Sequence, residues 1–245
     1  MKHAEALAIV TGAGKPHELI EVEILGHPCR VYANAPNSLR DLYVENRSDA
    51  CFIVYEHERY TFNEAFTISA RIAHILKNEY GIKKGDRVAI AMRNYPEWML
   101  SYWAITSMGA VAVGMNAWWV PHEMHYGLED SAPKVLICDR ERLQRFEEIR
   151  GDFPDLIVTA VRLEDEAPEW VVDWVEVINS PPEMPEVTID PDDDACIFYT
   201  SGTTGRPKGA QLTHRGCTNN IMNLVFANMV QPIALSKACL LYTSD

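Results

Sequence analysis

The segment Tyr199–Gly209, which reads YTSGTTGRPKG, combines glycines, hydroxyl residues and a lysine in one short run. Glycine tolerates positive φ, so successive backbone N–H groups can point at one anion, and hydroxyl groups add short donors. Lys208 supplies a mobile positive charge, and Pro207 stiffens the turn that carries it. This combination predicts a phosphate-binding loop. The residues expected to contact phosphate are Thr200, Ser201, Gly202, Thr203, Thr204, Gly205 and Lys208.

An ordinary surface loop rich in Ser, Gly and Thr is the alternative interpretation of this segment. However, the apolar pattern ACIFYT leads directly into it and the lysine lies at its far end, which favours phosphate binding. The Walker A pattern does not fit, because no Gly-Lys-Ser/Thr follows the glycines. We therefore expect a phosphate loop of another kind, whose hydroxyl groups can also ligate a magnesium ion.

Helical and strand patterns alternate upstream of the loop. Apolar residues recur at helical spacing from a Thr61–Glu64 capping box to Leu76, and Gly81 is placed to end that helix. Further helices are expected near residues 96–108, 121–129 and 140–150, and apolar strands near 87–92, 110–115, 134–139 and 155–161. This alternation predicts an α/β fold with parallel sheets flanked by helices on both faces.

Changes in composition divide the chain. The first expected part is an irregular segment (1–50) with short strand-like pieces, VEIL at 22–25 and CRVYA at 29–33. It is followed by a first α/β lobe (51–163), an acidic, Pro-rich connection (164–194), the start of a second lobe with the phosphate loop (195–238) and a non-native tail (239–245). The connection is expected to contain one short strand, WVEVI at 174–178. After the loop we expect an extended stretch and then a helix capped by Thr213 or His214.

Charge and cysteine usage narrow the class of protein. The net charge of −13 argues against nucleic acid as the main partner, because phosphate backbones need a basic face. The six cysteines are scattered without a CxxC pair, which favours reduced thiols and a cytoplasmic location.

The uncharged stretch Trp98–Val120 could span a bilayer on length alone. Pro96 and Gly109 divide it into a helix, a turn and a buried strand, so we expect no transmembrane segment.

The run YTSGTTGRPKGAQLTHR resembles the signature of the class I adenylate-forming enzymes, which include acyl-CoA synthetases, aryl-CoA ligases, luciferases and peptide-synthetase adenylation domains. The region from Tyr60 to Asp139 resembles the same family in order and spacing, so the resemblance covers roughly residues 37–230. It implies the α/β fold of the N-terminal part of the family's large domain. It also implies a two-step reaction, in which a carboxylate and Mg·ATP give an acyl-adenylate and pyrophosphate, and coenzyme A then takes the acyl group.

Roles within the loop follow from this resemblance. Ser201, Gly202, Thr203, Thr204, Gly205 and Lys208 would cradle the β- and γ-phosphates. Lys208 is the expected catalytic residue, because charge builds on the leaving pyrophosphate, and Thr200 is the expected magnesium contact. The expected partners are ATP, Mg²⁺, coenzyme A and a carboxylic acid, with a fatty acid favoured because the upstream region looks most like bacterial fatty acyl-CoA synthetases. The oligomeric state stays open.

Two alternatives to a fatty acyl-CoA synthetase remain. One is an aryl-CoA ligase or an amino-acid adenylation domain; the other, from a different class, is a non-catalytic phosphate-binding or interaction module.

The family's YGxTE-type and YxxGD-type motifs and its C-terminal lysine are not found, and CLLYTSD at 239–245 resembles a translated transposase adapter. We therefore expect an incomplete N-terminal fragment that is inactive on its own.

Overall fold

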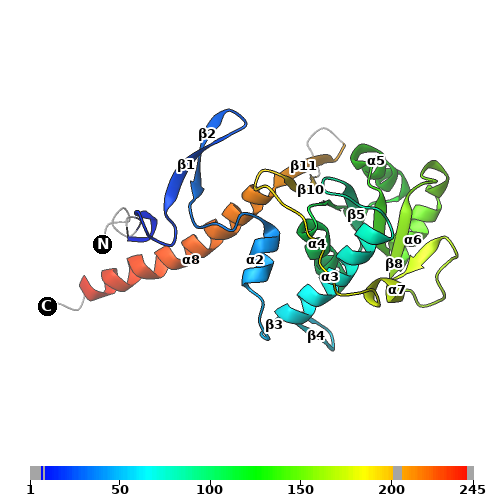
Figure 1. The fold of residues 1–245 in the computed structure, drawn as a ribbon, viewed down its shortest axis with the longest axis horizontal. Coiled ribbons are helices and arrows are strands. Elements are labelled where there is room, and N and C mark those ends of the chain that lie inside the picture. Colours follow the sequence, from blue (N-terminus) through cyan, green and yellow to red (C-terminus); the bar gives the residue numbers. More distant parts are fainter. Residues whose placement is uncertain (1–6, 8, 201–205, 242–245) are drawn as a thin grey trace.

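The computed structural model describes residues 7, 9–200 and 206–241, with side chains up to residue 229. A seven-stranded sheet in the order β11-β10-β6-β5-β7-β8-β9 lies in the larger part of the molecule, at the right in Figure 1. Its strands are β5 (Arg87–Ala91), β6 (Val111–Gly114), β7 (Val135–Asp139), β8 (Ile157–Val161), β9 (Val171–Asp173), β10 (Asp194–Thr200) and β11 (Lys208–Thr213). Neighbours pair in parallel except for the antiparallel pair β10–β11 at one edge.

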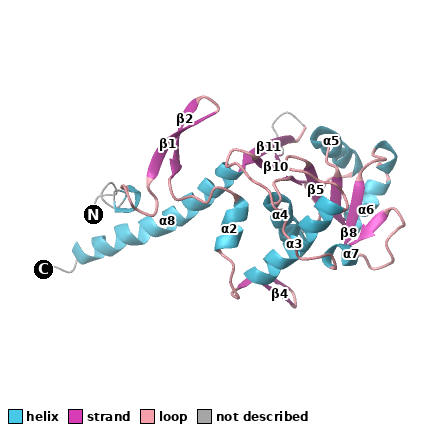
Figure 2. Cartoon of the chain, viewed as in Figure 1, coloured by secondary structure: helices cyan, strands magenta, loops and turns pink. Residues whose placement is uncertain are grey.

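Helices cover both faces of this sheet, as Figure 2 shows by colour. The helices of one layer are α3 (Phe62–Asn78), α4 (Pro96–Ser107) and α7 (Trp174–Ile178); those of the other are α5 (Pro121–Ser131) and α6 (Arg140–Glu147). Along β5, Val88 and Ile90 face the first layer and Ala89 and Ala91 the second, because successive strand residues point to opposite faces. The predicted α/β fold is confirmed.

The first fifty residues hold more regular structure than the sequence analysis expects. β1 (Leu19–Ile24) and β2 (His27–Tyr32) pair as an antiparallel hairpin, and the helix α2 (Leu39–Glu45) follows. The start of α2 is fixed by a capping box, in which the Ser38 and Asp41 side chains bond each other's backbone N–H groups. The two strands overlap the expected strand-like pieces, whereas the helix α2 corrects the expectation of an irregular segment. A second hairpin joins β3 (Cys51–Tyr55) to β4 (Glu58–Thr61).

A long helix, α8 (His214–Leu241), follows the predicted loop and runs alongside the first hairpin (Figure 1). Thr213 Oγ1 accepts a hydrogen bond from the backbone N–H of Gly216 at 3.1 Å, so Thr213 caps the helix as the sequence predicts. The hairpin is joined to α8 through Tyr32, whose N–H donates to Asn219 Oδ1 at 2.9 Å and whose hydroxyl donates to Asn223 Oδ1 at 2.8 Å.

The acidic connection differs from the sequence prediction in one element. WVEVI at 174–178 is the helix α7 and not a strand, because the Asp173 carboxylate accepts the N–H of Val175 at 2.8 Å and starts a helical turn. The strand β9 lies just before it. Strands from both sides of the connection share the sheet, since Cys196 of β10 pairs with Ala112 of β6. The expected division into lobes stays a prediction.

The uncharged stretch Trp98–Val120 contains most of α4, a turn at Gly109 (φ +74°) and the buried strand β6. This arrangement is the helix, turn and strand that the sequence predicts. Within the described ranges, none of the helices combines the length and apolar character needed to cross a membrane.

The capping box of α3 gives a prediction about stability. Thr61 Oγ1 accepts the N–H of Glu64 at 3.1 Å, and a carboxylate oxygen of Glu64 accepts the N–H of Thr61 at 2.8 Å. Replacing Thr61 by alanine is expected to lower the free energy of unfolding by about 1 kcal/mol, measured by urea denaturation. Thr67→Ala on the same helix is the control, since its hydroxyl donates only to the Asn63 carbonyl. Equal losses in both variants would contradict the cap's role.

Candidate phosphate and carboxylate site

The structure places the two ends of the predicted phosphate loop side by side. Thr200 is the last residue of β10 and Lys208 the first of β11, and the two are cross-strand partners. The Thr200 hydroxyl donates to the Lys208 carbonyl oxygen at 3.4 Å, and both side chains are exposed. The other predicted loop residues, Ser201, Gly202, Thr203, Thr204 and Gly205, lie outside the described residues. The hairpin therefore delivers one hydroxyl and one cation to the same edge of the sheet.

Helix α5 supports this hairpin from one face of the sheet. The Tyr126 hydroxyl donates to the Pro207 carbonyl oxygen at 3.2 Å, and the Arg206 guanidinium lies 5.7 Å from the Tyr126 ring centroid. On β10, the Tyr199 hydroxyl donates to Asp130 Oδ2 at 2.6 Å; burial and this bond raise the pKa of Tyr199. The loop ends are thus fixed by two tyrosines that the sequence analysis does not single out.

Trp119 also supports the β10–β11 hairpin, because it packs between Tyr199 of β10 and Gly127 of α5. Trp119 meets the Tyr199 ring edge to face, with centroids 5.1 Å apart. It packs so closely on Gly127 of α5 that a Cβ there would lie 2.4 Å from the tryptophan ring. Only glycine fits at this contact, and no motif in the sequence shows it, because the contact arises from packing.

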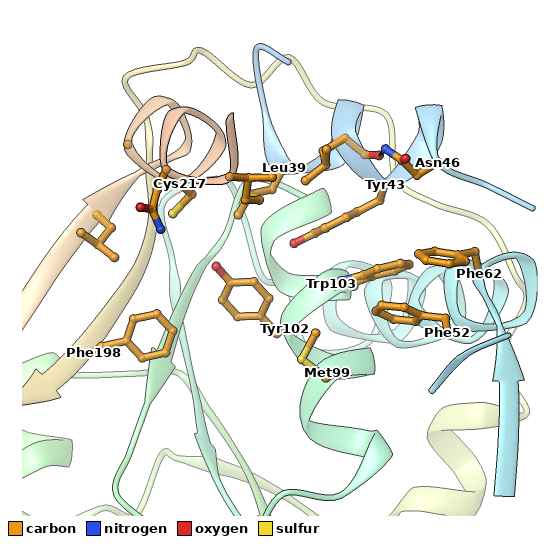
Figure 3. Close-up of a pocket in the computed structure, with 15 residues that line it drawn as sticks. Leu39, Tyr43, Asn46, Phe52, Phe62, Met99, Tyr102, Trp103, Phe198 and Cys217 are labelled. Atoms are coloured by element: carbon orange, nitrogen blue, oxygen red, sulfur yellow. Dashed lines mark hydrogen bonds between the residues drawn. The ribbon is translucent and has the colours of Figure 1, made fainter. Parts of the chain in front are cut away.

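An apolar cavity of about 600 Å³ lies on the opposite face of the sheet from α5. Figure 3 shows its side chains coming from α2, α4, β10, α8 and the start of α3. The cavity is lined by Leu39, Leu42, Tyr43, Asn46, Phe52, Phe62, Met99, Tyr102, Trp103, Phe198, Leu212, Gly216, Cys217, Asn220 and Ile221. Phe198 precedes Thr200 by two residues, so the side chains of both leave β10 on the cavity's face. The cavity therefore lies on the same face of the sheet as Thr200, the first residue of the predicted loop.

Stacked aromatic rings form one wall of this cavity. Trp103 stacks on Tyr43 at 4.3 Å and on Phe52 at 4.6 Å between ring centroids. The lining also includes the polar side chains of Asn46 and Asn220. A concave, mostly apolar site of this size with a few polar groups suits a small organic ligand with an apolar body.

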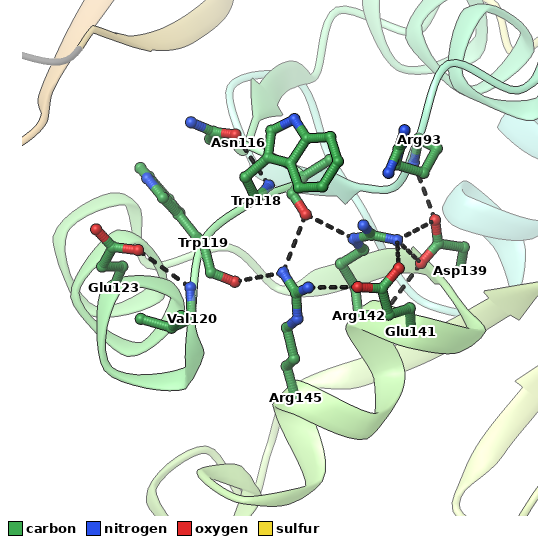
Figure 4. A network of polar contacts seen from close by, with 11 residues as sticks. Arg93, Asn116, Trp118, Trp119, Val120, Glu123, Asp139, Glu141, Arg142 and Arg145 are labelled. Carbon is green, nitrogen blue, oxygen red and sulfur yellow. Dashed lines mark hydrogen bonds and ion pairs between the residues drawn. The ribbon is translucent and has the colours of Figure 1, made fainter.

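A second cluster of polar side chains lies at the carboxyl ends of β5 and β7 (Figure 4). The Asp139 carboxylate accepts the N–H of Arg93 at 2.9 Å and pairs with the buried Arg142 guanidinium at 3.0 Å. Arg142 Nε also donates to the Ala117 carbonyl oxygen at 2.8 Å. Arg145 donates to the carbonyl oxygens of Ala117 and Trp119, at 3.0 and 2.7 Å. These bonds fix the turn after β6 that carries Trp119 towards the loop.

The predicted magnesium contact can be assessed from the groups present. Thr200 offers one exposed hydroxyl oxygen, which suits an ion that takes its remaining ligands from phosphate oxygens and water. Among the side chains that the structure describes, no group of three or more His, Cys, Asp or Glu residues could hold a metal ion. The described part of the site is therefore compatible with Mg²⁺ arriving together with a nucleotide.

Comparison with known proteins identifies the family. The model of the AMP-binding enzyme family matches residues 41–243. The chain is 31% identical over 168 residues to 4-coumarate–CoA ligase 3 of Oryza sativa subsp. japonica, covering 69% of the chain and 29% of the relative. It is 32% identical over 156 residues to the 3-hydroxybenzoate–CoA/4-hydroxybenzoate–CoA ligase of Thauera aromatica, covering 63% of the chain and 30% of the relative.

Solved structures agree with these relatives. The anthranilate CoA ligase AuaEII in complex with anthranoyl-AMP superposes with a TM-score of 0.69 at 27% identity, over 75% of this chain and 36% of that one. A Mycobacterium tuberculosis fatty acyl CoA synthetase gives a TM-score of 0.51 at 29% identity, over 64% and 30%. The chain spans about a third or less of the length of the curated relatives described above. The resemblance found in the sequence is confirmed: the chain belongs to the AMP-binding enzymes, the family of the adenylate-forming CoA ligases.

Proposed function

We propose that this chain provides the phosphate loop and part of the carboxylate site of an ATP-dependent acid–CoA ligase. In the proposed reaction a carboxylate oxygen attacks the α-phosphorus of ATP and pyrophosphate leaves. The thiol of coenzyme A then displaces AMP from the acyl-adenylate. The observation that carries this proposal is the β10–β11 hairpin, which holds Thr200 and Lys208 as cross-strand partners at the ends of the family's signature.

Each loop residue has a role in this proposal. Lys208 neutralises charge that develops on the leaving pyrophosphate, which makes it the catalytic cation of the chain. Backbone N–H groups and hydroxyls of Ser201, Gly202, Thr203, Thr204 and Gly205 hold the β- and γ-phosphates, and Thr200 contributes an oxygen towards Mg²⁺. When bound, Mg²⁺ supplies further neutralisation of the phosphate charge. The cytoplasm is the proposed location, supported by scattered cysteines that form no CxxC pair.

The proposed substrate is a carboxylic acid with an apolar body, held in the apolar cavity that Phe198 lines. Support comes from the cavity's volume of about 600 Å³ and from its position on the face that Thr200 shares. A fatty acid remains our first proposal. An aryl acid is the second candidate, favoured by the stacked wall of Tyr43, Trp103 and Phe52 and by relatives named for 4-coumarate and hydroxybenzoate.

The two substrate classes can be separated by direct titration. Decanoate and 4-coumarate would be added in turn to the chain, and binding followed by calorimetry. Gly216→Trp, which places a large side chain on the cavity wall at an exposed position of α8, is expected to abolish binding of the acid that fits. Arg40→Ala, on α2 but outside the lining, is the control. Binding that survives Gly216→Trp would exclude the cavity as the acid's site.

Phosphate binding by the loop is tested at Lys208. Replacing Lys208 by alanine is expected to weaken binding of Mg·ATP roughly ten- to a hundredfold, because a hydrogen bond from a charged group contributes about 1.5–3 kcal/mol. Calorimetry on the purified chain measures the change, with circular dichroism to show that the fold is intact. Lys77→Ala, an exposed lysine in the last turn of α3, is the matched control. Unchanged affinity in Lys208→Ala would remove the proposed role of the lysine.

The same titration addresses the non-catalytic alternative. A phosphate-binding module without adenylation would bind inorganic pyrophosphate and ATP through Lys208 but would show no coupling to a carboxylic acid. In a ligase, the carboxylic acid and ATP meet at one site, so a saturating acid is expected to change the affinity for Mg·ATP. Equal ATP affinity with and without the acid would favour the non-catalytic module.

A further inference from the structure

Two cysteine side chains meet at the wall of the apolar cavity. Cys196 is a fully buried residue of β10, and Cys217 lies in the first turn of α8, where its half-buried side chain lines the cavity. Their Sγ atoms are 4.0 Å apart, although the residues are 21 positions apart in sequence. Figure 3 shows the Cys217 side chain on the first turn of α8, on the side of the Tyr102 and Phe198 side chains. The fold has thus created a pair of neighbouring thiols.

The surroundings make the two thiols chemically different. The two sulfurs share a hydrogen bond in which either thiol can be the donor, and this contact lowers the pKa of Cys217 and raises that of Cys196. The Tyr102 hydroxyl donates a hydrogen bond to Cys196 Sγ at 3.5 Å, so the buried Cys196 sulfur has a second polar partner besides Cys217. Of the two, Cys217 lines the cavity whereas Cys196 is fully buried, so Cys217 is the thiol that a small molecule reaches first and the nucleophile of the pair. Its place on a cavity wall gives a small oxidant access to it.

We propose that Cys196 and Cys217 are an oxidative modification site, at which hydrogen peroxide converts the two thiols into a reversible disulfide. Cys217 Sγ attacks one peroxide oxygen, so an S–O bond forms, the O–O bond breaks and hydroxide leaves to become water. The Cys196 thiol then loses its proton and its sulfur attacks Cys217 Sγ. The S–S bond forms, the S–O bond breaks and a second water leaves, so two electrons pass from the sulfurs to the peroxide.

The geometry allows this bond with a small movement. A disulfide needs the sulfurs to close from 4.0 Å to about 2.05 Å, which is a movement of about 2 Å. The bond would tie the start of α8 to the central sheet. It would also close a ring that contains both Thr200 and Lys208, the two ends of the predicted phosphate loop. The disulfide rests on the thiols and does not depend on the proposed function.

Peptide mapping of the unmodified chain tests the proposal directly. The chain is treated with hydrogen peroxide, alkylated, digested with trypsin and analysed by mass spectrometry. Cys196 and Cys217 fall on different tryptic peptides, 163–208 and 216–237, each with a single cysteine. We expect a linked pair of these peptides, with loss of both free thiols, that disappears after reduction with dithiothreitol. Oxidation of the exposed Cys51 while Cys196 and Cys217 both stay alkylated would overturn the proposal.

A second experiment detects the pair of neighbouring thiols without oxidising them. Phenylarsine oxide bridges two neighbouring thiols, so one arsenical is expected to bind per chain and to be lost in Cys217→Ser and in Cys196→Ser. Cys51→Ser, which removes an exposed cysteine of β3, is the matched control and should retain the arsenical. Circular dichroism confirms that each variant is folded. Retention of the arsenical by folded Cys217→Ser would place the reactive pair elsewhere and contradict the assignment.

Discussion

Replacing Asp139 by alanine is expected to lower the free energy of unfolding of this chain by about 3–5 kcal/mol. Asp139 and Arg142 form a buried ion pair, with 4% and 2% of their side chains exposed. Removing the carboxylate leaves the buried guanidinium with the half-exposed Glu141 as its remaining carboxylate partner, besides its bond to the Ala117 carbonyl oxygen. The same carboxylate also accepts the N–H groups of Arg93 and Arg142, so two backbone donors lose their partner.

A second Asp–Arg pair provides a matched control for this variant. Asp192 and Arg215 are joined by hydrogen bonds of 2.6 and 2.9 Å, but both side chains are partly exposed. Exposed pairs contribute about 0–1 kcal/mol, so Asp192→Ala should have a much smaller effect. Urea denaturation followed by tryptophan fluorescence measures both. Similar losses in the two variants would contradict the view that burial makes the Asp139 pair costly to break.

The double variant Asp139→Ala/Arg142→Met extends this prediction. It removes the uncompensated charge and fills the space of the guanidinium with an apolar chain, so it is expected to recover part of the stability lost in Asp139→Ala. Recovery would show that the stranded charge, and not the lost capping bonds, accounts for most of the loss. A double variant less stable than Asp139→Ala would show that Arg142 stabilises mainly through its bond to Ala117.

Local patterns in the sequence were enough to predict most of the sheet and its helices. Strand residues such as Val88 and Ala89 belong to opposite apolar layers, and the Thr61 capping box marks the start of α3 as expected. The error at WVEVI has a local cause: β-branched and aromatic residues favour strands, yet the Asp173 cap turns this short piece into a helix. For α2, Ser38 and Asp41 offered a capping signal that the sequence analysis does not use.

Residues of the candidate site could be proposed from the sequence only where their chemistry is local. Lys208 and Thr200 follow from the loop motif, because the relevant groups are neighbours in sequence. The support from Tyr126 depends on a contact with Pro207, 81 positions away, and the cavity gathers side chains from α2, α4 and α8. The Cys196–Cys217 pair is likewise made by packing. Such contacts depend on how the elements cross, which periodicity does not encode.

Acidification from pH 7 to about pH 4 is expected to destabilise the chain through His214. This histidine is fully buried at the start of α8, and its Nδ1 accepts the backbone N–H of Leu39 at 3.1 Å. Burial lowers the pKa of His214 from 6.5 to about 4; Lys84 acts in the same direction, whereas the carboxylates of Asp193 and Asp41 oppose it. A protonated ring could no longer accept the Leu39 N–H, so the folded state requires the neutral form.

The sign and size of this effect follow from proton linkage. Above pH 6.5 the ring is neutral in both states and contributes no pH dependence. Between pH 6.5 and about 4 the unfolded chain binds the proton and the folded chain does not, so stability falls as the pH falls. The shift corresponds to a loss of about 3 kcal/mol that levels off below pH 4. Carboxylates whose pKa is lowered in the folded state, such as Glu64 and Asp86, stabilise the fold only while they are ionised. Their contribution to the free energy of unfolding is lost at lower pH, as the pH falls below their unfolded pKa values near 4.

Urea denaturation at several pH values tests this prediction against a His214→Asn variant. Asparagine keeps an oxygen that can accept the Leu39 N–H but has no proton to gain in this range, so its stability should change far less between pH 6.5 and 4. At neutral pH the variant is expected to be less stable, because the smaller side chain fills the buried site incompletely. The two stability curves should therefore converge as the pH falls. Parallel curves would show that His214 is not the group whose titration destabilises the fold, and that the loss arises from other groups.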